Sequence, residues 1–371
     1  MFEQAHLSVL IPVRANDPSL LLERLRLRDH CDLTGTETIL TDDGSPDEAA
    51  QELREFCEAR GWRYARLETA HLPFSLARAR NAGLATAQTF WVFFDDADMA
   101  YEAAFFRKLH KELALLKETP FSFLSLPGVY LSGESTEDVL AKGEIDEILP
   151  DLLTRLALED PRGGGDNRSI QSFAPASAIL AIERDTALSV GGYDEEFHGW
   201  GGEDRDFIFR LLAINDALPR PTDFAATRVW NLNDTHTFAG WRALYRLHGD
   251  YMARKGLYAF HLYHESNPWK TAMARERNFE QAARKAYAFA DEKNCLGKEL
   301  PIDHALRRSL LFSVYADCAL SVPAKPATRG AARAMARFKK LFRNPHAFFR
   351  DTQISYLRKI RHLFPAKENE I

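Results

Sequence analysis

The chain has 371 residues, of which 46% are hydrophobic and 27% charged, and its formal net charge is −5 at pH 7. This composition is that of a globular protein large enough for more than one domain, and the charge balance excludes a generally basic nucleic-acid binder. The four cysteines, Cys31, Cys57, Cys295 and Cys318, form no CxxC pair. They therefore indicate neither a zinc ribbon nor a disulfide framework, and they predict a cytoplasmic protein.

The N-terminus lacks the basic and apolar regions of a signal peptide, and no apolar run approaches the ~20 residues of a membrane-spanning helix. The first ninety residues alternate between apolar runs and amphipathic segments. Strands are expected at residues 7–13, 37–40 and 62–67, and helices at 18–29, 47–60 and 74–86. This alternation predicts βαβ units on a mostly parallel sheet flanked by helices, an α/β fold.

The apolar run at residues 89–94 is expected to be a further buried strand, because it is rich in β-formers and ends abruptly in acids. Ligands of open α/β sheets bind at the carboxyl ends of the strands. Asp96 and Asp98, one residue apart, can face one hard cation there, such as Mg²⁺ or Mn²⁺ shared with diphosphate oxygens. Asp95 is expected to be a structural residue at the strand end.

The middle of the chain is less regular. A helix is expected at 101–118, strands at 121–126 and 173–182, and a helix at 206–215. Residues 133–168 are polar, acidic and finally Gly-rich, which predicts a mobile insertion between these elements.

The segment Trp200-Gly201-Gly202-Glu203-Asp204 combines an aromatic ring, two glycines and two acids. Glycines let the backbone approach a ligand closely, and tryptophan offers a flat face to a sugar ring. Two adjacent carboxylates can divide the work, one binding hydroxyls and the other taking a proton. The alternative is a Gly-rich turn that leads into a helix with an acidic first turn.

After Pro268 the pattern becomes helical and rich in Ala, Arg and Lys, so a boundary is expected near 270. Residues 325–362 hold eleven Lys or Arg and one acid, interleaved with aromatic residues. This pattern is typical of binding to an anionic membrane surface or a partner, and the alternative is a basic helix that packs on its own domain.

The Asp-x-Asp pair at a strand end, followed by Trp-Gly-Gly-Glu-Asp, resembles nucleotide-sugar glycosyltransferases of the GT-A fold, in the family 2-like group of bacterial capsule and chondroitin polymerases. The segment Trp200–Asp206 is also similar to the animal β-1,4-galactosyltransferases. The resemblance covers about Leu7 to Pro268. It implies a catalytic domain at 1–270 and a basic, helical C-terminal region at 271–371. The nucleotide-binding half would be about 1–100 and the acceptor-binding half about 170–270.

The resemblance implies a nucleotide pocket early in the chain. Pro12, Val13 and Arg14 match the family's first strand, which lines the uracil, and Asp43 matches the acid that holds uridine. For Asp43 the alternative is an Asx-turn before the next helix.

The segment Leu76–Gly83 is similar to the family's Ala-Arg-Asn-x-Gly helix, which places Arg80 and Asn81 at the nucleotide. Arg78 and Arg80 point in different directions, and we favour Arg80, because a planar guanidinium suits diphosphate oxygens. The alternative is a solvated helix face.

The resemblance also implies a metal, Mn²⁺ or Mg²⁺, held on the diphosphate by Asp96 and Asp98. The segment Phe260–Ser266 is similar to the His-Leu-Tyr-His segment of chondroitin-synthase-like enzymes. His261 is therefore the expected third ligand, with His264 in reserve.

For catalysis the resemblance assigns Asp204 as the general base and Glu203 as the group that holds an acceptor hydroxyl. The acceptor site is expected to contain Trp200, Gly201, Gly202, Glu203 and Tyr193. His236 is expected to be structural or an acceptor contact.

The predicted function is an inverting, metal-dependent transfer from a UDP-sugar to a glycan or lipid-linked acceptor. Residues 340–351 resemble a tail of capsule-assembly enzymes, which favours bacterial surface polysaccharide synthesis by a peripheral enzyme at the inner face of the cytoplasmic membrane. One alternative is a retaining enzyme similar to the N-acetylgalactosaminyltransferases, and another is a non-catalytic glycan-binding or scaffold subunit. The sequence leaves the donated sugar, the linkage and the oligomeric state open.

Overall fold

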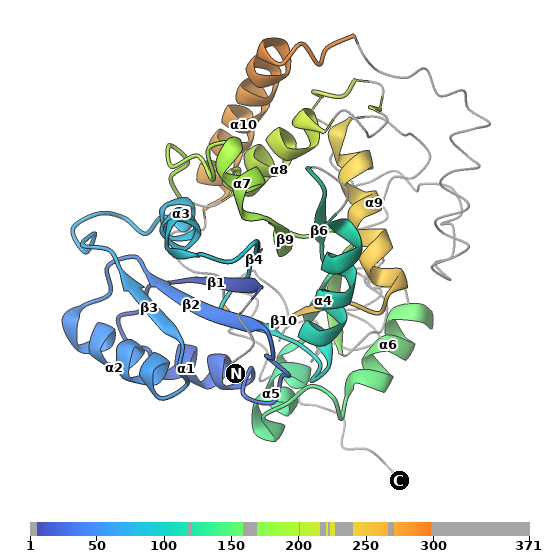
Figure 1. Ribbon diagram of the computed structural model, residues 1–371. Helices are drawn as coiled ribbons and strands as arrows, with labels where there is room; N and C mark the ends of the chain where they lie inside the picture. The colour runs from blue at the N-terminus through green and yellow to red at the C-terminus, as the bar shows by residue number, and fades with distance from the viewer. Residues whose placement is uncertain are drawn as a thin grey trace, which may run out of the picture.

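A computed structural model describes residues 6–117, 121–158, 169–199, 201–215, 220–221, 223–226, 240–265 and 271–297. Its centre is a six-stranded sheet with helices on both faces (Figure 1). The strands, in spatial order, are β3 (Arg63–Arg66), β2 (Thr36–Asp42), β1 (Leu7–Val13), β4 (Trp91–Phe94), β9 (Leu180–Glu183) and β6 (Phe123–Ser125). The first four are parallel to one another, and β9 runs antiparallel between β4 and β6. The predicted α/β class, with a mostly parallel sheet, is confirmed.

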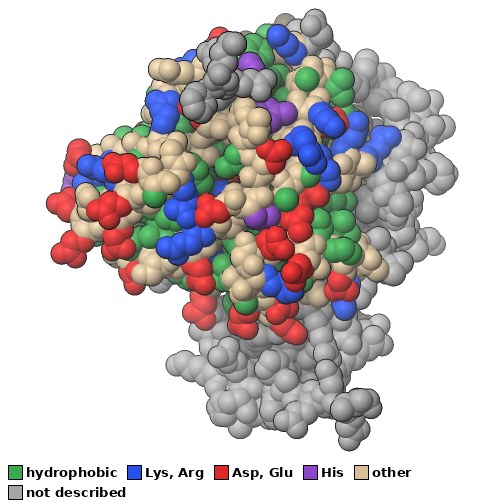
Figure 2. Space-filling view, turned by 60° about the horizontal axis from the view of Figure 1, so that its bottom comes forward, with side chains coloured by type: hydrophobic (Ala, Val, Ile, Leu, Met, Phe, Trp, Pro, Cys, Tyr) green, Lys and Arg blue, Asp and Glu red, His purple; other side chains and the backbone are tan. Residues whose placement is uncertain are grey.

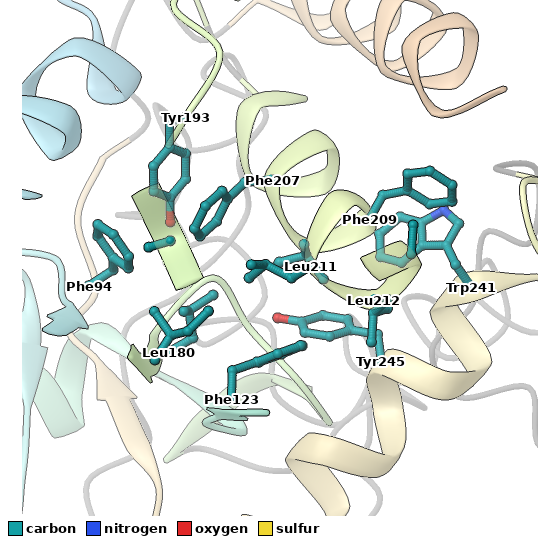
Figure 3. Close-up of a cluster of buried hydrophobic side chains, with 14 of the residues drawn as sticks. Phe94, Phe123, Leu180, Tyr193, Phe207, Phe209, Leu211, Leu212, Trp241 and Tyr245 are labelled. Atoms are coloured by element: carbon teal, nitrogen blue, oxygen red, sulfur yellow. The ribbon is translucent and has the colours of Figure 1, made fainter. Parts of the chain in front are cut away.

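Strand β1 is buried along its whole length, and its side chains alternate between two cores. Val9 and Ile11 face one core, which contains side chains of α1 (Ser19–Arg26), α2 (Asp47–Glu58) and α4 (Phe105–Leu116). Leu10 faces the other, which contains side chains of α3 (Leu76–Thr86), α8 (Glu203–Ile214) and α9 (Trp241–Arg254). Figure 3 shows this second core, in which aromatic rings of β4, α8 and α9 gather.

The outer face of α2 is a solvated acidic surface. Figure 2 shows acidic side chains gathered over the lobe that carries α2 in Figure 1. The exposed acids of this helix are Asp47, Glu48, Glu52, Glu55 and Glu58. The apolar side chains of the same helix point inward, so α2 has the amphipathic pattern of an ordinary covering helix.

A second, four-stranded sheet lies beside the first, in the order β5 (Met99–Ala100), β10 (Ala259–His261), β7 (Gly128–Leu131) and β8 (Ile170–Ala174). Two helices, α5 (Gly133–Lys142) and α6 (Leu149–Leu158), pack on it. The prediction of a mobile insertion at 133–168 is therefore wrong for residues 133–158, and residues 159–168 lie outside the described part. Val139, Ile145 and Leu152 are buried in this core. The acidic residues around α5 obscured the amphipathic pattern that the leucines of α6 carry.

The single strand predicted at 173–182 is also wrong, because β8 and β9 belong to different sheets. Pro175 lies between them and has no N–H to donate to a ladder. Next to it, Ser177 donates from its backbone N–H and from its hydroxyl to the Leu126 carbonyl. The chain thus leaves one sheet and enters the other within a few residues.

The acidic segment after the glycine pair enters its helix earlier than predicted, since α8 begins at Glu203 rather than 206. A short helix, α7 (Arg184–Ser189), precedes the glycine-rich loop. Beyond the predicted boundary near 270, α10 (Ala272–Glu292) packs on α8. The basic segment 325–362 lies outside the described residues. Within those that are described, no helix is both long and apolar enough to span a membrane.

Candidate active site

The candidate site lies at the end of β1, where the chain connects to neighbouring strands on opposite sides. The chain leaves β1 toward β2 on one side, and β4 later joins β1 on the other. Crevices at such a switch point, outside the carboxyl ends of the strands, are where open α/β sheets bind ligands. Strand β1 ends at Val13 and β4 at Phe94, so Pro12, Val13 and the acids after Phe94 share this edge.

Asp95 anchors the acidic loop to the core. It is fully buried, and its Oδ2 accepts from Arg28 at 2.7 Å while its Oδ1 accepts from the Tyr101 hydroxyl at 2.6 Å. Burial raises the pKa of Asp95, although the charge of Arg28 opposes this shift. Arg28 also donates to the Asp96 carbonyl at 2.7 Å. This arrangement fits the structural role expected for Asp95, and it fixes the backbone that carries the next two acids.

Arg80 joins the two acidic motifs. Its side chain is 1% exposed, and its Nη2 donates to Asp96 Oδ1 at 2.9 Å. Its Nη1 lies 3.8 Å from Oε1 of Glu203, at the start of α8. Arg80 therefore links residues more than a hundred positions apart in the sequence. Arg78, two residues earlier, points instead to Asp43.

Asp98 lies against two histidines. Its Oδ2 is 3.3 Å from Nε2 of His261 and 3.0 Å from Nε2 of His264. One ligand atom from each of the three residues lies within 4.8 Å of the others, so the three side chains could hold one metal ion. Burial alone would raise the pKa of Asp98, but the two histidines and Arg24 outweigh it and lower that pKa.

A long-range strand pairing assembles this group. Strand β10 pairs antiparallel with β5, directly after Asp98, and the Leu262 N–H donates to the Asp98 carbonyl at 2.9 Å. Between the histidines, the Tyr263 N–H donates to Thr136 Oγ1 at 2.7 Å and the Tyr263 carbonyl accepts from Arg24 at 2.9 Å. Both predicted histidines thus reach Asp98.

Asp96, predicted as a metal ligand with Asp98, is not part of this three-residue group. Its side chain is 30% exposed and is engaged with Arg80 instead. The structure therefore separates the two acids of the Asp-x-Asp motif, one held by an arginine and one by histidines.

Asp43 lies at the carboxyl end of β2 and is fully buried. Its carboxylate accepts from Thr69 Oγ1 and the Ser75 N–H, each at 2.8 Å, and from two nitrogens of Arg78, each at 2.7 Å. Arg14 donates to the carbonyls of Ala70 and Leu72, at 2.9 and 2.6 Å. The predicted nucleotide residues Asp43 and Arg14 thus hold the 69–75 loop beside the strand ends.

Asn81 fixes the glycine-rich loop. Its Nδ2 donates to the Tyr193 carbonyl and to Glu195, and its Oδ1 accepts from the Tyr193 N–H, all at 2.8 Å. A Cβ on Gly192 would lie 2.6 Å from that Oδ1, and the φ of Gly192 is +66°, so a side chain is excluded there on both grounds. The amide of Asn81, predicted to contact the nucleotide, is thus engaged within the protein.

Tyr193, predicted at the acceptor site, is 2% exposed and belongs to the core in Figure 3. Its ring stacks on Phe207 at 4.2 Å and packs edge-on against Phe94 at 5.1 Å. The Arg80 guanidinium lies 5.0 Å from the centroid of the same ring. Tyr193 thus packs against Arg80 and has little surface to offer a substrate.

Glu203 and Asp204 form the first turn of α8, after Gly201 and Gly202 with φ values of +80° and +101°. Glu203 is buried, and burial together with the neighbouring Asp204 charge raises the pKa of Glu203 to about 7. Asp204 is half-buried and accepts from the Arg205 N–H at 2.8 Å. Trp200 and His236 lie outside the described residues.

Tyr130 is a site residue that the sequence did not reveal. It faces His261 in the register of β7 and β10, and the two rings are 4.7 Å apart. Burial raises the pKa of Tyr130 to about 12, with added contributions from the charges of Asp96, Asp98 and Asp204. Tyr130 therefore lies within electrostatic reach of both acidic motifs. Its strand, Gly-Val-Tyr-Leu, carries no sequence signal of this role.

Residues 8–288 match the family model described as glycosyltransferase-like family 2. Among curated relatives, the hyaluronan synthase of Pasteurella multocida is 29% identical over 47% of this chain and 19% of its own length. The chondroitin synthase of Escherichia coli is 25% identical over 55% of this chain and 32% of its own length. The pre-mycofactocin glycosyltransferase of Mycobacterium tuberculosis is 31% identical over 57% of this chain and 40% of its own length. The matches thus span between about a fifth and two fifths of these relatives.

Solved structures are similar at lower identity. The glucosyl-3-phosphoglycerate synthase of Mycobacterium tuberculosis, solved with Mn²⁺ and UDP, is 16% identical over 78% of this chain and 80% of its own, with a TM-score of 0.37. The mannosyltransferase PcManGT of Pyrobaculum calidifontis was solved with GDP-Man and Mn²⁺. It is 14% identical over 92% of this chain and 88% of its own, with a TM-score of 0.36.

Proposed function

We propose, from the premise that this chain belongs to the glycosyltransferase-like family 2, that it transfers a sugar from a nucleotide sugar to an acceptor hydroxyl with the help of a divalent cation. The predicted resemblance to GT-A, family 2-like glycosyltransferases is confirmed by that membership. The observation that carries the proposal is the Asp98, His261 and His264 group at the strand ends, with Glu203 and Asp204 linked to the same edge through Arg80.

The cation would be held by Asp98, His261 and His264, and it would neutralise charge on the departing nucleoside diphosphate. One carboxylate and two imidazoles form a mixed oxygen and nitrogen ligand set. Mg²⁺ prefers oxygen ligands, whereas imidazole suits transition metals, so this ligand set favours Mn²⁺.

Arg80 would contact the donor. Its Nε and Nη1 are buried and have no hydrogen-bond partner among the described residues, although Nη2 is bound to Asp96. A buried guanidinium with N–H groups to spare fits the oxygens of a diphosphate. Asp43 and Arg14 would shape the pocket of the base, uracil in a UDP-sugar, through the 69–75 loop that they hold.

Asp204 would take the proton from the acceptor hydroxyl, which then attacks the anomeric carbon from the face opposite the diphosphate and inverts its configuration. Glu203, with its pKa raised to about 7, would bind a neighbouring acceptor hydroxyl. A retaining mechanism would not need Asp204 as a base, so the Asp204→Asn variant separates the two outcomes.

We place the acceptor among bacterial capsule or surface glycans, and the enzyme at the inner face of the cytoplasmic membrane. The glycan class rests on the resemblance of residues 340–351 to a tail of capsule-assembly enzymes. The membrane location rests on the basic, aromatic sequence of residues 325–362. Sedimentation of the full chain with anionic and with neutral lipid vesicles tests it, because binding to anionic vesicles alone is expected.

The proposed function is tested by release of nucleoside diphosphate from a panel of UDP-sugars with Mn²⁺, Mg²⁺ or EDTA. Release with one donor, abolished by EDTA and by Asp98→Ala, is the expected result. Asp185→Asn, an exposed change on α7, is the matched control. Release that persists in Asp98→Ala or in EDTA would contradict the metal-dependent mechanism.

A further inference from the structure

Helix α10 lies beyond the boundary expected near 270, yet it packs on α8, the helix that begins with Glu203 and Asp204 (Figure 1). Its buried side chains recur every four residues and form one inward face. They are Asn278, Ala282, Ala286 and Ala290. Because burying a polar side chain is costly unless it is hydrogen-bonded, the partner of the Asn278 amide shows what this face of α10 holds.

Asn278 holds the end of the glycine-rich loop, whose described residues are 191–199 and 201–202. Its Nδ2 donates to the His198 carbonyl at 3.0 Å, and Arg277 donates to the same carbonyl at 3.1 Å. A Cβ added to Gly202, whose φ is +101°, would lie 2.9 Å from both the Cβ and the carbonyl oxygen of Asn278. The loop backbone thus lies directly against α10, with no room for a side chain. This contact fixes the residue that immediately precedes the first turn of α8.

Lys285 holds the middle of the same loop, two helical turns further along α10. Its Nζ donates to the carboxylates of Asp194 and Glu196, the second at 2.6 Å. The Glu196 side chain is 74% exposed and that of Asp194 22%, so solvent screens the first ion pair much more than the second. Burial would raise the pKa of Asp194, but its hydrogen bonds, first to Lys285 and then to the Glu196 N–H, outweigh burial and lower that pKa.

The start of the loop is held separately, by residues of the α/β core. Asn81 of α3 bonds both backbone groups of Tyr193, and Arg210 of α8 donates to the Gly192 carbonyl at 2.8 Å. The loop contains no helix or strand, so contacts of this kind set its path. Loss of the α10 contacts would therefore free the part of the loop that leads into α8 and leave its start in place.

We propose that Lys285 and Asn278 are positioning residues for the transfer reaction, which hold the glycine-rich loop so that Glu203 and Asp204 face the acceptor. The inference rests on the proposed function, and it makes α10 part of the catalytic unit. Neither residue would touch the reacting groups, because both act through the loop. Their effect on rate comes from geometry, since a misplacement of a catalytic group by about 1 Å can cost about 10²-fold.

The hold on the loop is tested first without catalysis, by hydrogen exchange of the full chain. Lys285→Met keeps the apolar stem and removes the charge. The Glu196 and Phe197 N–H groups, which both donate to Asp194, are expected to exchange at least about tenfold faster, because one charge-assisted hydrogen bond less opposes local opening. Amides of β4 should be unchanged, and Lys285→Arg should restore protection.

Arg284→Met is the matched control for this arm. Arg284 precedes Lys285 on α10 and is exposed, so the variant removes the same charge from the same helix. Its loop amides are expected to exchange as in the wild type. Equal exchange in Lys285→Met and the wild type would overturn the inference.

The second arm measures transfer with the donor that the UDP-sugar panel identifies. Lys285→Met is expected to lower kcat/KM for the acceptor about 10- to 100-fold, whereas Lys285→Arg and Arg284→Met stay near the wild type. Calorimetry with UDP and Mn²⁺ should give unchanged affinity and stoichiometry, which shows that the folded fraction is unchanged. Asn278→Ala, which keeps the Cβ beside Gly202 and removes the amide, should act in the same direction. An unchanged kcat/KM for the acceptor in Lys285→Met, or an equal loss of UDP binding, would overturn the inference.

The two arms separate this inference from the proposed function. Absence of transfer from every donor in the wild type, with loop exchange that still depends on Lys285, would reject the transferase and keep α10 as the support of the loop. Transfer that is equal in the wild type and in Lys285→Met would keep the transferase and reject the positioning role.

Discussion

The acids that follow β4 and the acids that begin α8 lie in opposite electrostatic environments. Each carboxylate after β4 has its own cationic or imidazole partner: Asp95 has Arg28, Asp96 has Arg80, and Asp98 has His261 and His264. At the start of α8, two carboxylates are adjacent in sequence. Glu203 lies 3.8 Å from Arg80, which it shares with Asp96.

This difference appears in the pKa values. The pKa of Asp98 is lowered despite burial, whereas that of Glu203 is raised to about 7 by burial and by Asp204. A carboxylate that stays ionised suits a cation, and a carboxyl group poised near neutrality suits proton and hydroxyl chemistry. These opposite pKa shifts support the proposal that the strand-end group serves the donor and a metal, and that the α8 group serves the acceptor.

The strongest test of this difference is to neutralise Asp204. Asp204→Asn keeps the size of the side chain and its bond from the Arg205 N–H, but it removes the base. We expect transfer to fall about 10²- to 10⁴-fold, the usual contribution of general base catalysis, with UDP binding unchanged. Stopped assays of product formation and calorimetry with UDP and Mn²⁺ measure the two. Unchanged transfer would mean that the enzyme does not invert through Asp204.

The next largest effect is expected from Arg80, which links the two groups of acids. Arg80→Met leaves Asp96 and buried Glu203 without their shared cation. Because breaking a buried ion pair leaves an uncompensated charge, the free energy of unfolding should fall by about 3 kcal/mol. Urea unfolding measures this. Arg80→Lys, which keeps the charge, should lose less, and equal losses in both variants would show that the guanidinium geometry rather than the charge matters.

The raised pKa of Glu203 predicts how stability depends on pH. The folded pKa of about 7 lies above the unfolded value of 4.5, so the folded state binds more protons between these values. Stability from this group is therefore present below about pH 4.5 and is lost as the pH rises through 7, by at most about 3 kcal/mol. Glu203→Gln should lack this loss, while the exposed Glu280→Gln control keeps it. Parallel pH profiles of wild type and Glu203→Gln would contradict the assignment.

The parts of this site that follow from local sequence patterns could be predicted, whereas those that depend on contacts between distant segments could not. The strand ends at Val13 and Phe94, and the acids beyond them, follow from local apolar runs and their abrupt ends. The proximity of Asp98 to His261 came only from resemblance to a family. The pairing of β5 with β10 joins segments about 160 residues apart, and no local pattern encodes it.

Residues whose contacts depend on tertiary packing were the hardest to predict from the sequence. Asn81 and Tyr193 have the residue types of ligand contacts, yet one is engaged by the loop backbone and the other lies in the core. Tyr130 looks like an ordinary strand residue and lies against His261. In each case the tertiary packing, and not the chemistry of the side chain, decides what the residue can reach.

The smallest of the predicted effects tests whether the strand-end group is one metal site with two imidazoles. His264→Ala leaves Asp98 and His261 in place but removes the nearer of the two nitrogens, 3.0 Å from Asp98. Since losing even an outer-shell partner of a metal costs about 10- to 100-fold in affinity, the affinity for Mn²⁺ should fall by at least about tenfold. Titration of Mn²⁺ followed by electron paramagnetic resonance measures this, with the exposed His6→Ala as the control. Unchanged affinity in His264→Ala, together with a loss in His261→Ala, would reduce the site to one imidazole, as the sequence predicted together with Asp96 and Asp98. The donor side would then rely on Asp98, one histidine and the diphosphate itself, and its contrast with the acceptor side would rest on the arginine partners of Asp95 and Asp96.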